Sequence, residues 1–205
     1  MISIEIEKKL KAYKGQQVLR VKEQFPTGSI TKIYGPSGAG KTTLLKTIAG
    51  FTEPEKGKIV IDGATWLNTD QKINLSPQRR MAGFVFQDYA QFPNMTVLQH
   101  LEYATTDTAW ITRLLSIGKL EPFASHKPEY LSGGQQQRLA ILRALAIKPN
   151  LLLMDEPFSA LDPENKTALI AELKVVFEEL GTSVLIVTHN PQELDGLTER
   201  ELRIH

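Results

Sequence analysis

Cysteine is absent from the 205 residues of this sequence. The absence excludes disulfide bonds and thiolate metal ligands, and it suits a reducing compartment such as the cytosol. The sequence also lacks long apolar runs, since no stretch approaches the roughly 18–20 residues that a helix needs to span a bilayer. We therefore expect any role at a membrane to depend on a partner protein.

A strong charge of either sign is lacking too. Lysine and arginine number 24 and aspartate and glutamate 23, which leaves a formal net charge of +1. Such a balance gives no overall field that would attract nucleic acid or an anionic membrane. We expect no nucleic-acid partner, although a local basic patch would be compatible with this composition.

The apolar segments alternate between strand-like and helix-like patterns. The first ten residues alternate isoleucine with polar residues, which predicts a half-buried strand rather than a signal peptide. Residues 64–80 are predicted to form a loop. Further strands are predicted at residues 18–21, 30–34, 59–61, 83–86, 151–154 and 184–187, and helices at 43–49, from 131–135 to about 147, and at 163–180. This alternation favours an α/β fold with a mainly parallel sheet covered on both faces.

Residues 35–42 read Gly-Pro-Ser-Gly-Ala-Gly-Lys-Thr and fit the phosphate-binding-loop pattern G-x-x-x-x-G-K-[ST]. An apolar strand precedes the motif and a helix follows it, which is the context that the motif requires. Glycines let backbone N–H groups converge on phosphate oxygens, and the helix N-terminus adds its positive dipole end. Lys41 is expected to reach the β- and γ-phosphates, and the Thr42 hydroxyl to bind Mg²⁺. The motif predicts nucleotide binding.

A second apolar segment, residues 151–154, ends at two carboxylates, Asp155 and Glu156. A buried strand that delivers an aspartate holds Mg²⁺ in many nucleoside triphosphatases. Because side chains alternate along a strand, Glu156 is expected to face a water molecule while Asp155 faces the metal. A general base so placed typically contributes about 10²–10⁴-fold to the rate. The alternative for Glu156 is a solvated strand end.

The sequence Leu-Ser-Gly-Gly-Gln at residues 131–135 lies between these two motifs. Taken alone, it would fit a helix N-cap beside a flexible turn. In this order, however, the motifs resemble those of the ATP-binding-cassette (ABC) ATPases of membrane transporters along nearly the whole chain. The resemblance implies a P-loop NTPase core with a mainly parallel sheet, N-terminal antiparallel strands and an inserted α-helical subdomain.

The resemblance also implies boundaries within a single ATPase domain. The core would comprise about residues 1–87 and 136–205, and the helical subdomain about residues 88–135. No C-terminal regulatory domain is expected. The tail, residues 192–205, is expected to be too short for the final strands and helices that are usual in the family. Phe51, Phe84 and Phe86 are expected in the core.

ATP and Mg²⁺ are the cofactors that the resemblance implies. Two cassettes would stack head to tail, so that the signature of one closes on the γ-phosphate held by the other. Tyr13 would stack on adenine, with a structural aromatic on a strand edge as the alternative, and Asp162 would lie across the dimer interface. The residues assigned to the nucleotide are Tyr13, Gly35, Pro36, Ser37, Gly38, Ala39, Gly40, Lys41, Thr42, Thr43, Ser132, Gly133, Gly134, Gln135 and Asp162, and those assigned to the metal are Thr42, Gln87 and Asp155.

Three residues receive catalytic roles from the resemblance. Glu156 would act as the general base, and His189 would contact the γ-phosphate and orient the attacking water with Glu156. Gln87 would coordinate Mg²⁺ or that water and sense the transport partner. The alternative for Gln87 is an ordinary surface glutamine, and a lone histidine at a strand end is usually incidental. Asn190 stands where an acidic residue is common in the family, and we expect it to be tolerated.

The implied function is an ATP-hydrolysing subunit that couples hydrolysis to movement of a solute across a membrane. Its partners would be a second ATPase subunit and the transmembrane permease subunits, which would hold it at the cytoplasmic face of the inner membrane as a peripheral protein. Residues 91–97 resemble the importer segment that helps to receive a coupling helix, and the short helical insert resembles that of molybdate and sulfate importers. A small solute such as an oxyanion is therefore expected.

Two other functions remain as alternatives. A soluble ABC-type motor acting on nucleic acid or ribosomes usually carries two cassettes, a coiled-coil insert or basic extensions, which this sequence does not show. A small-molecule kinase that uses only the phosphate loop is disfavoured by residues 131–135 and by Glu156 beside Asp155, because a kinase must exclude water.

Overall fold

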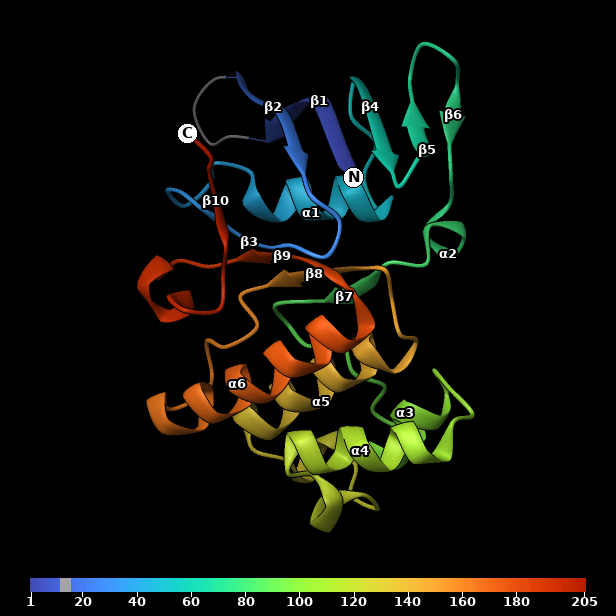
Figure 1. The fold of residues 1–205 in the computed structure, drawn as a ribbon, viewed down its shortest axis with the longest axis vertical. Helices are drawn as coiled ribbons and strands as arrows, with labels where there is room; N and C mark the ends of the chain where they lie inside the picture. The colour runs from blue at the N-terminus through green and yellow to red at the C-terminus, as the bar shows by residue number, and fades with distance from the viewer. Residues whose placement is uncertain (12–15) are drawn as a thin grey trace.

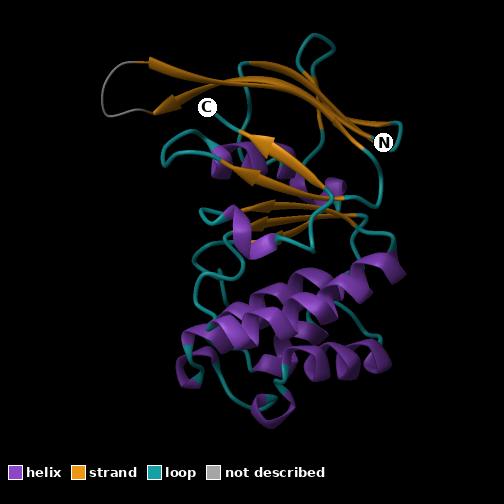
Figure 2. Cartoon of the chain, turned by 60° about the vertical axis from the view of Figure 1, so that its left-hand side comes forward, coloured by secondary structure: helices purple, strands orange, loops and turns teal. Residues whose placement is uncertain are grey.

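The computed structural model describes residues 1–11 and 16–205. Tyr13, which the sequence assigns to adenine, lies outside the described residues. The two sheets and the helices stack in layers (Figures 1 and 2): an antiparallel sheet, then helix α1 (Lys41–Ala49), then a parallel sheet, and finally the remaining long helices. None of the helices in the described part of the chain combines the length and the apolar character needed to cross a membrane.

The antiparallel sheet is built from strands that lie between residues 2 and 74, in the order β2-β1-β4-β5-β6. Ile2, Ile4 and Ile6 are buried on one face of β1, whereas the polar residues between them, Ser3 and Glu5, are more exposed, as the alternating pattern predicts. The strands are β1 (Ile2–Lys11), β2 (Gln16–Phe25), β4 (Lys56–Ile61), β5 (Ala64–Asn68) and β6 (Ile73–Asn74).

The parallel sheet has the order β10-β3-β9-β8-β7, and each neighbouring pair in it runs parallel. Every residue of β8 and β9 is buried, because one face packs on α1 and the other on the long helices. The strands are β3 (Ile30–Tyr34), β7 (Gly83–Val85), β8 (Leu151–Asp155), β9 (Ser183–Val187) and β10 (Arg200–Arg203). The predicted α/β class, with a parallel sheet and N-terminal antiparallel strands, is confirmed.

Helices cover the second face of the parallel sheet, with α5 and α6 against it and α3 and α4 beyond them (Figure 1). Capping fixes where they begin: Ser132 and Gln135 form a capping box at α5, and the Asp162 side chain accepts from the Asn165 backbone N–H at α6. The remaining helices are α2 (Pro77–Arg80), α3 (Val97–Glu102), α4 (Thr108–Gly118), α5 (Gly133–Ala146) and α6 (Pro163–Leu180), with 3₁₀ turns at Glu121–Phe123, Pro128–Tyr130 and Pro191–Leu194. The subdomain boundaries remain a prediction.

The expected loop at residues 64–80 is wrong. That segment forms β5, β6 and α2. Trp66 and Leu67 are buried against α1 and the inner face of the sheet, so that tertiary packing outweighs the polar composition of the segment.

The expectation that residues 192–205 are too short for the final strands usual in the family is wrong for one strand, β10. Strand β10 adds to the edge of the parallel sheet, where the Ile204 N–H donates to the Tyr34 carbonyl at 2.8 Å. Leu202 and Ile204 are buried. Pairing with the edge of the parallel sheet stabilises the short strand.

The prediction of a core position for Phe51 is wrong too, since its side chain is 48% exposed. Its ring packs edge-on against Phe84, with ring centroids 5.3 Å apart, but it lies beyond the helix end at Gly50. Phe84 is buried as expected, and Phe86 is half-buried against the same cluster.

Candidate active site

Four parallel strands end at the same edge of the sheet, and each delivers one predicted site segment. The phosphate loop follows β3, Gln87 follows β7, Glu156 follows β8 and His189 follows β9. Open α/β sheets bind ligands outside the carboxyl ends of their strands. The topology therefore gathers residues that are far apart in the sequence.

The phosphate loop follows a strand whose side chains are largely buried. Gly35 has φ 153°, and a β-carbon at this position would collide with the Ile204 carbonyl, so that only glycine fits beside the C-terminal strand. Gly40 has φ 98° and forms the N-cap of α1, which points its first backbone N–H groups at the loop. Both geometries fit the anion site that the motif predicts.

Lys41 is only 5% exposed, and its ammonium donates to the carbonyls of Gly35 at 2.8 Å and Pro36 at 3.0 Å. Burial lowers the pKa of Lys41, and the charges of Glu156 and Asp155 oppose that shift. A single cation set among backbone groups, with two carboxylates nearby, suits a polyanionic phosphate chain accompanied by a divalent cation.

Asp155 is the most deeply buried acidic group at this edge, at 2% exposure. Its Oδ1 atom is fully enclosed and has no hydrogen-bond partner among the described residues. Burial raises the pKa of Asp155, whereas a hydrogen bond with the Thr42 side chain and the charges of Lys46, Lys41 and His189 oppose the rise. A buried carboxylate oxygen without a donor, beside a threonine hydroxyl, fits the oxygen ligands that Mg²⁺ takes.

Glu156 and His189 form the closest side-chain contact at this edge, with Nε2 of His189 2.6 Å from Oε1 of Glu156. Gln87 donates from Nε2 to the other oxygen of Glu156 at 3.4 Å, near the upper limit for a hydrogen bond. The His189 side chain is half exposed, so that the group opens towards solvent. The structure therefore brings together the three residues that were predicted to be catalytic.

The backbone of Glu156 differs from the expectation of a continued strand. Strand β8 ends at Asp155, and Glu156 takes a left-handed conformation with φ 52°. Its N–H donates to the Val187 carbonyl at 3.0 Å. The separation between the two carboxylates thus arises from a turn and not from strand alternation.

A hollow of about 680 Å³ lies over the phosphate loop and joins most of these groups. Four of the residues that line it were not predicted from the sequence. Lys8, Lys9 and Leu10 continue the alternating first strand, and Thr52 follows α1. The predicted residues that line it are Ser37, Gly38, Gly40, Lys41, Thr42, Thr43, Gln87, Glu156 and His189. Lys8 pairs with Glu55 at 3.1 Å. No sequence pattern marked this lysine as part of a site.

The signature residues and Asp162 lie elsewhere in the same chain. Ser132, Gly133, Gly134 and Gln135 line a separate hollow of about 540 Å³ together with Asp162, at the start of α5 and α6. No residue of the phosphate loop lines that hollow. A single copy of the chain therefore does not bring the signature to its own Lys41.

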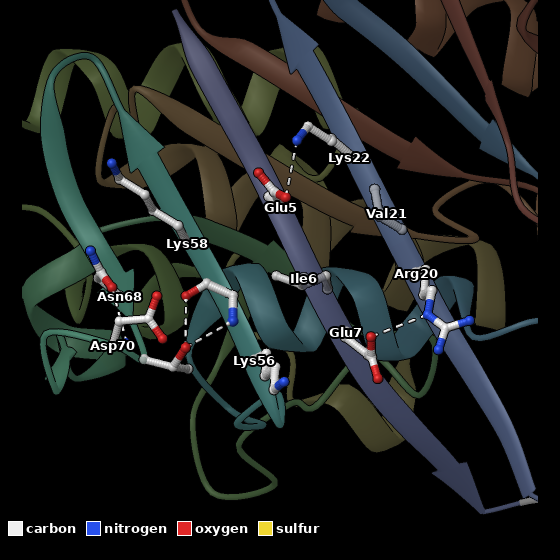
Figure 3. Close-up of a pocket in the computed structure, with 12 residues that line it drawn as sticks. Glu5, Ile6, Glu7, Arg20, Val21, Lys22, Lys56, Lys58, Asn68 and Asp70 are labelled. Carbon is white, nitrogen blue, oxygen red and sulfur yellow. Dashed lines mark hydrogen bonds and ion pairs between the residues drawn. The ribbon is translucent and has the colours of Figure 1, made fainter.

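A third hollow, of about 670 Å³, lies on the outer face of the antiparallel sheet, and the described residues that line it include none of the predicted site residues (Figure 3). Glu5 pairs with Lys22 and Glu7 with Arg20 across β1 and β2, each at 3.1 Å. Exposed pairs of this kind typically contribute about 0–1 kcal/mol. We interpret this face as the solvated side of the sheet.

The fold and the site define a class: an α/β nucleoside triphosphatase whose phosphate loop and strand-end carboxylates meet at one edge of a parallel sheet. The comparisons with known proteins narrow the class. A family model described as ABC transporter matches residues 18–159. The chain belongs to the ABC transporter ATPase family, whose members bind and hydrolyse ATP.

Relatives and solved structures agree with this family. The chain is 39% identical over 188 residues to the molybdenum import ATP-binding protein ModC of Escherichia coli O6:H1, covering 91% of this chain and 53% of ModC. It is 40% identical to the sulfate/thiosulfate import ATP-binding protein CysA of Mycobacterium bovis, covering 88% of this chain and 52% of CysA. The chain thus spans about half the length of the curated relatives it matches.

A dimeric post-hydrolysis structure of the ATP-binding cassette MJ0796, bound to ADP and Pi, superposes on this chain with a TM-score of 0.82 and 33% identity. The match covers 100% of this chain and 94% of that cassette. The chain therefore shares its overall fold with a solved cassette.

Proposed function

We propose that this chain is the ATP-hydrolysing motor subunit of an importer for a small oxyanion, of the molybdate or sulfate class. It works in a pair of ATPase subunits at the cytoplasmic face of the membrane, against transmembrane permease subunits. The family match supports the motor, and the names of the relatives ModC and CysA support import of an oxyanion.

The observation that carries the hydrolytic function is the contact of Glu156 with His189 beside the phosphate loop. Lys41 and the N–H groups of the loop bind the β- and γ-phosphates of ATP. Thr42, Asp155 and Gln87 would hold Mg²⁺, which when bound would supply positive charge for the phosphate oxygens. Glu156 accepts the proton of the attacking water, and His189 orients Glu156 and contacts the γ-phosphate.

The signature completes the site from the second subunit. Ser132, Gly133 and Gly134 begin α5, and a helix N-terminus is an anion site because its first N–H groups have no partner within the helix. These residues do not reach the phosphate loop of their own chain, so a second copy of the chain supplies them. The two subunits then close only on an intact triphosphate, and hydrolysis lets them separate.

The docking segment for the permease is the loop between Gln87 and α3. Phe92 in this loop is 39% exposed, and its ring packs against that of Tyr103, which directly follows α3 and is 70% exposed, with ring centroids 5.4 Å apart. Exposed aromatic groups that cluster are typical of protein–protein contacts. The loop follows Gln87 directly, so that a permease bound there can bias the position of Gln87.

Copurification tests the transporter assignment. We would tag Glu156→Gln, add ATP and Mg²⁺, extract native membranes in mild detergent, and identify the bound proteins by mass spectrometry. The control is the same variant that also carries Lys41→Ala, which weakens nucleotide binding. A polytopic membrane protein retained in preference to the control supports the proposal. Ribosomal or nucleic-acid-binding proteins, with no membrane protein, would replace it with a soluble motor.

A further inference from the structure

Gln137 is a buried polar residue of α5 to which neither the sequence motifs nor the proposed function assigns a role. Its side chain is 1% exposed. The amide Nε2 donates to the Glu156 carbonyl at 3.1 Å and to Ser159 Oγ at 3.2 Å, and Oε1 accepts from the Ala160 N–H at 3.0 Å. All three of these bonds reach one segment, residues 156–160.

This segment contains the proposed general base. The Glu156 N–H is bound by the Val187 carbonyl of β9 at 3.0 Å, and the Glu156 carbonyl is bound by Gln137 from α5. Hydrogen bonds from two different elements therefore fix the backbone on both sides of the Glu156 α-carbon, in a left-handed conformation that non-glycine residues rarely adopt. The direction of the Glu156 side chain follows from that backbone.

An amide is suited to this place because it carries donors and an acceptor on one planar group. A carboxylate could still accept from the Ala160 N–H. Its second oxygen, however, has no proton to donate to the Glu156 carbonyl or to Ser159 Oγ. An apolar side chain would leave the Ala160 N–H without its acceptor and would remove the bond from α5 to the Glu156 carbonyl, which among the described residues would keep only the hydroxyl and the N–H of Ser159. The contacts therefore specify glutamine by its chemistry as well as by its length.

The same helix begins at the signature. Ser132 caps α5, and a β-carbon on Gly134 would lie 3.3 Å from the Ala160 carbonyl, so that the helix N-terminus packs on the segment that Gln137 holds. A shift of α5 would therefore move residues 156–160 with it.

We propose that Gln137 is a positioning residue for the hydrolytic step: its amide holds the backbone of Glu156 so that the carboxylate meets the attacking water. The amide also ties Glu156 to the helix that carries the signature. This inference rests on the proposed role of Glu156 as general base.

Gln137→Met tests the proposal in the 205-residue chain with ATP and Mg²⁺. We expect kcat to fall by about 10- to 100-fold, because small misplacements of a catalytic group are costly. The affinity for ATP, measured by calorimetry, should stay within about twofold, because the lost interaction acts on the chemical step. Gln137→Glu keeps the shape and the acceptor but loses both donor bonds, and it should show the same separation of kcat from binding if the methionine variant folds poorly.

The matched control is Thr182→Val. Thr182 is fully buried, and its hydroxyl donates to the Pro149 carbonyl at 2.8 Å, at the end of the parallel sheet opposite the site. This variant should lower Tm and leave kcat unchanged, which separates lost stability from lost positioning. Wild-type kcat in both Gln137 variants would overturn the proposal.

Glu156→Gln, measured in the same assay, separates two kinds of failure. If Glu156→Gln abolishes hydrolysis and the Gln137 variants do not, Gln137 has no positioning role and the proposed function stands. If Glu156→Gln also hydrolyses ATP normally, the general base is misassigned and the inference about Gln137 falls with it.

Discussion

Two adjacent carboxylates, Asp155 and Glu156, lie in different surroundings. Asp155 is the last residue of a strand buried on both faces, and one of its oxygens is enclosed with no hydrogen-bond partner in the described part of the chain. Glu156 lies beyond the strand, in a turn, and contacts His189 at the partly exposed edge. One position thus favours a bound cation, and the other favours proton transfer with water.

Asp155→Asn should stabilise the nucleotide-free chain at neutral pH. Because burial raises the pKa of Asp155 in the folded state, stability is greatest below the ordinary aspartate pKa and is lost as the pH rises through the raised value. The asparagine removes this loss, so that Tm near pH 7 should increase and its pH dependence between about 4 and 7 should weaken. Thermal unfolding across that pH range measures both effects.

The same variant tests the metal assignment. Mg²⁺ should increase the Tm of the wild-type chain in the presence of ATP and should add little to Asp155→Asn. Asp70→Asn, which changes an exposed carboxylate, should behave like the wild type. An undiminished effect of Mg²⁺ in Asp155→Asn would show that another group holds the cation.

Lys41→Ala should weaken ATP binding by about 10- to 100-fold, which is the loss expected for hydrogen bonds between a cation and phosphate. Isothermal titration calorimetry measures it, with Lys56→Ala, an exposed lysine on the antiparallel sheet, as the control. Equal affinities in the two variants would refute nucleotide binding at the phosphate loop.

At the residue scale, sequence reasoning located the phosphate loop, Asp155 and Glu156 because spacing alone defines them. It could not find Gln137, since the last of three consecutive glutamines looks like a polar helix residue until the fold places it against residues 156–160. Backbone turns such as that of Glu156 are set by packing between β8, β9 and α5, and no local pattern encodes them. The roles assigned to these residues remain predictions.

At the scale of elements, helix α1 is anchored at both ends. Its N-terminus carries the phosphate loop, and its C-terminus meets the buried guanidinium of Arg80, which donates to the carbonyls of Thr47 at 2.9 Å and Ile48 at 2.6 Å. Arg80 also donates to the Leu75 carbonyl at 2.9 Å. A cation at a helix C-terminus satisfies its free carbonyls and opposes the negative end of the dipole.

Arg80→Met should lower the free energy of unfolding by about 3 kcal/mol, because charged hydrogen bonds are lost and buried carbonyls are left without donors. For a chain of this size the Tm should fall by roughly 6–12 °C. Arg79→Met, an exposed neighbour on the same short helix, should change Tm little, and chemical denaturation of both variants gives the comparison. An Arg80 variant as stable as the Arg79 variant would remove Arg80 from this role.

The elements that sequence reasoning missed share a physical cause. Strands β5 and β6 are short and polar at their edges, and β10 is only four residues long, so that their local patterns are weak. Each forms because it adds to the edge of a sheet whose other strands are strongly patterned. In contrast, β8 and β9 are continuous apolar runs, and α6 has a capped start and a glycine at its end, which local patterns predict well.

At the scale of the whole molecule, the layered fold places the phosphate loop and the signature apart from each other. The phosphate loop, Glu156 and His189 lie at one edge of the parallel sheet, whereas the signature lies at the start of α5 in a separate hollow. The fold class was predictable because motif order and alternating elements specify it. The arrangement of the two hollows depends on how α5 and α6 pack on the sheet, which sequence spacing does not give.

The measurement that tests this account most directly is ATP hydrolysis by the wild-type chain and by Glu156→Gln, with ATP binding and sedimentation recorded for both. The account predicts that Glu156→Gln loses at least about 10²-fold in rate, as expected for removal of a general base. It also predicts that the variant still binds ATP and sediments as a dimer only when ATP is present. Hydrolysis near the wild-type rate by Glu156→Gln would contradict the central claim that Glu156 activates the attacking water.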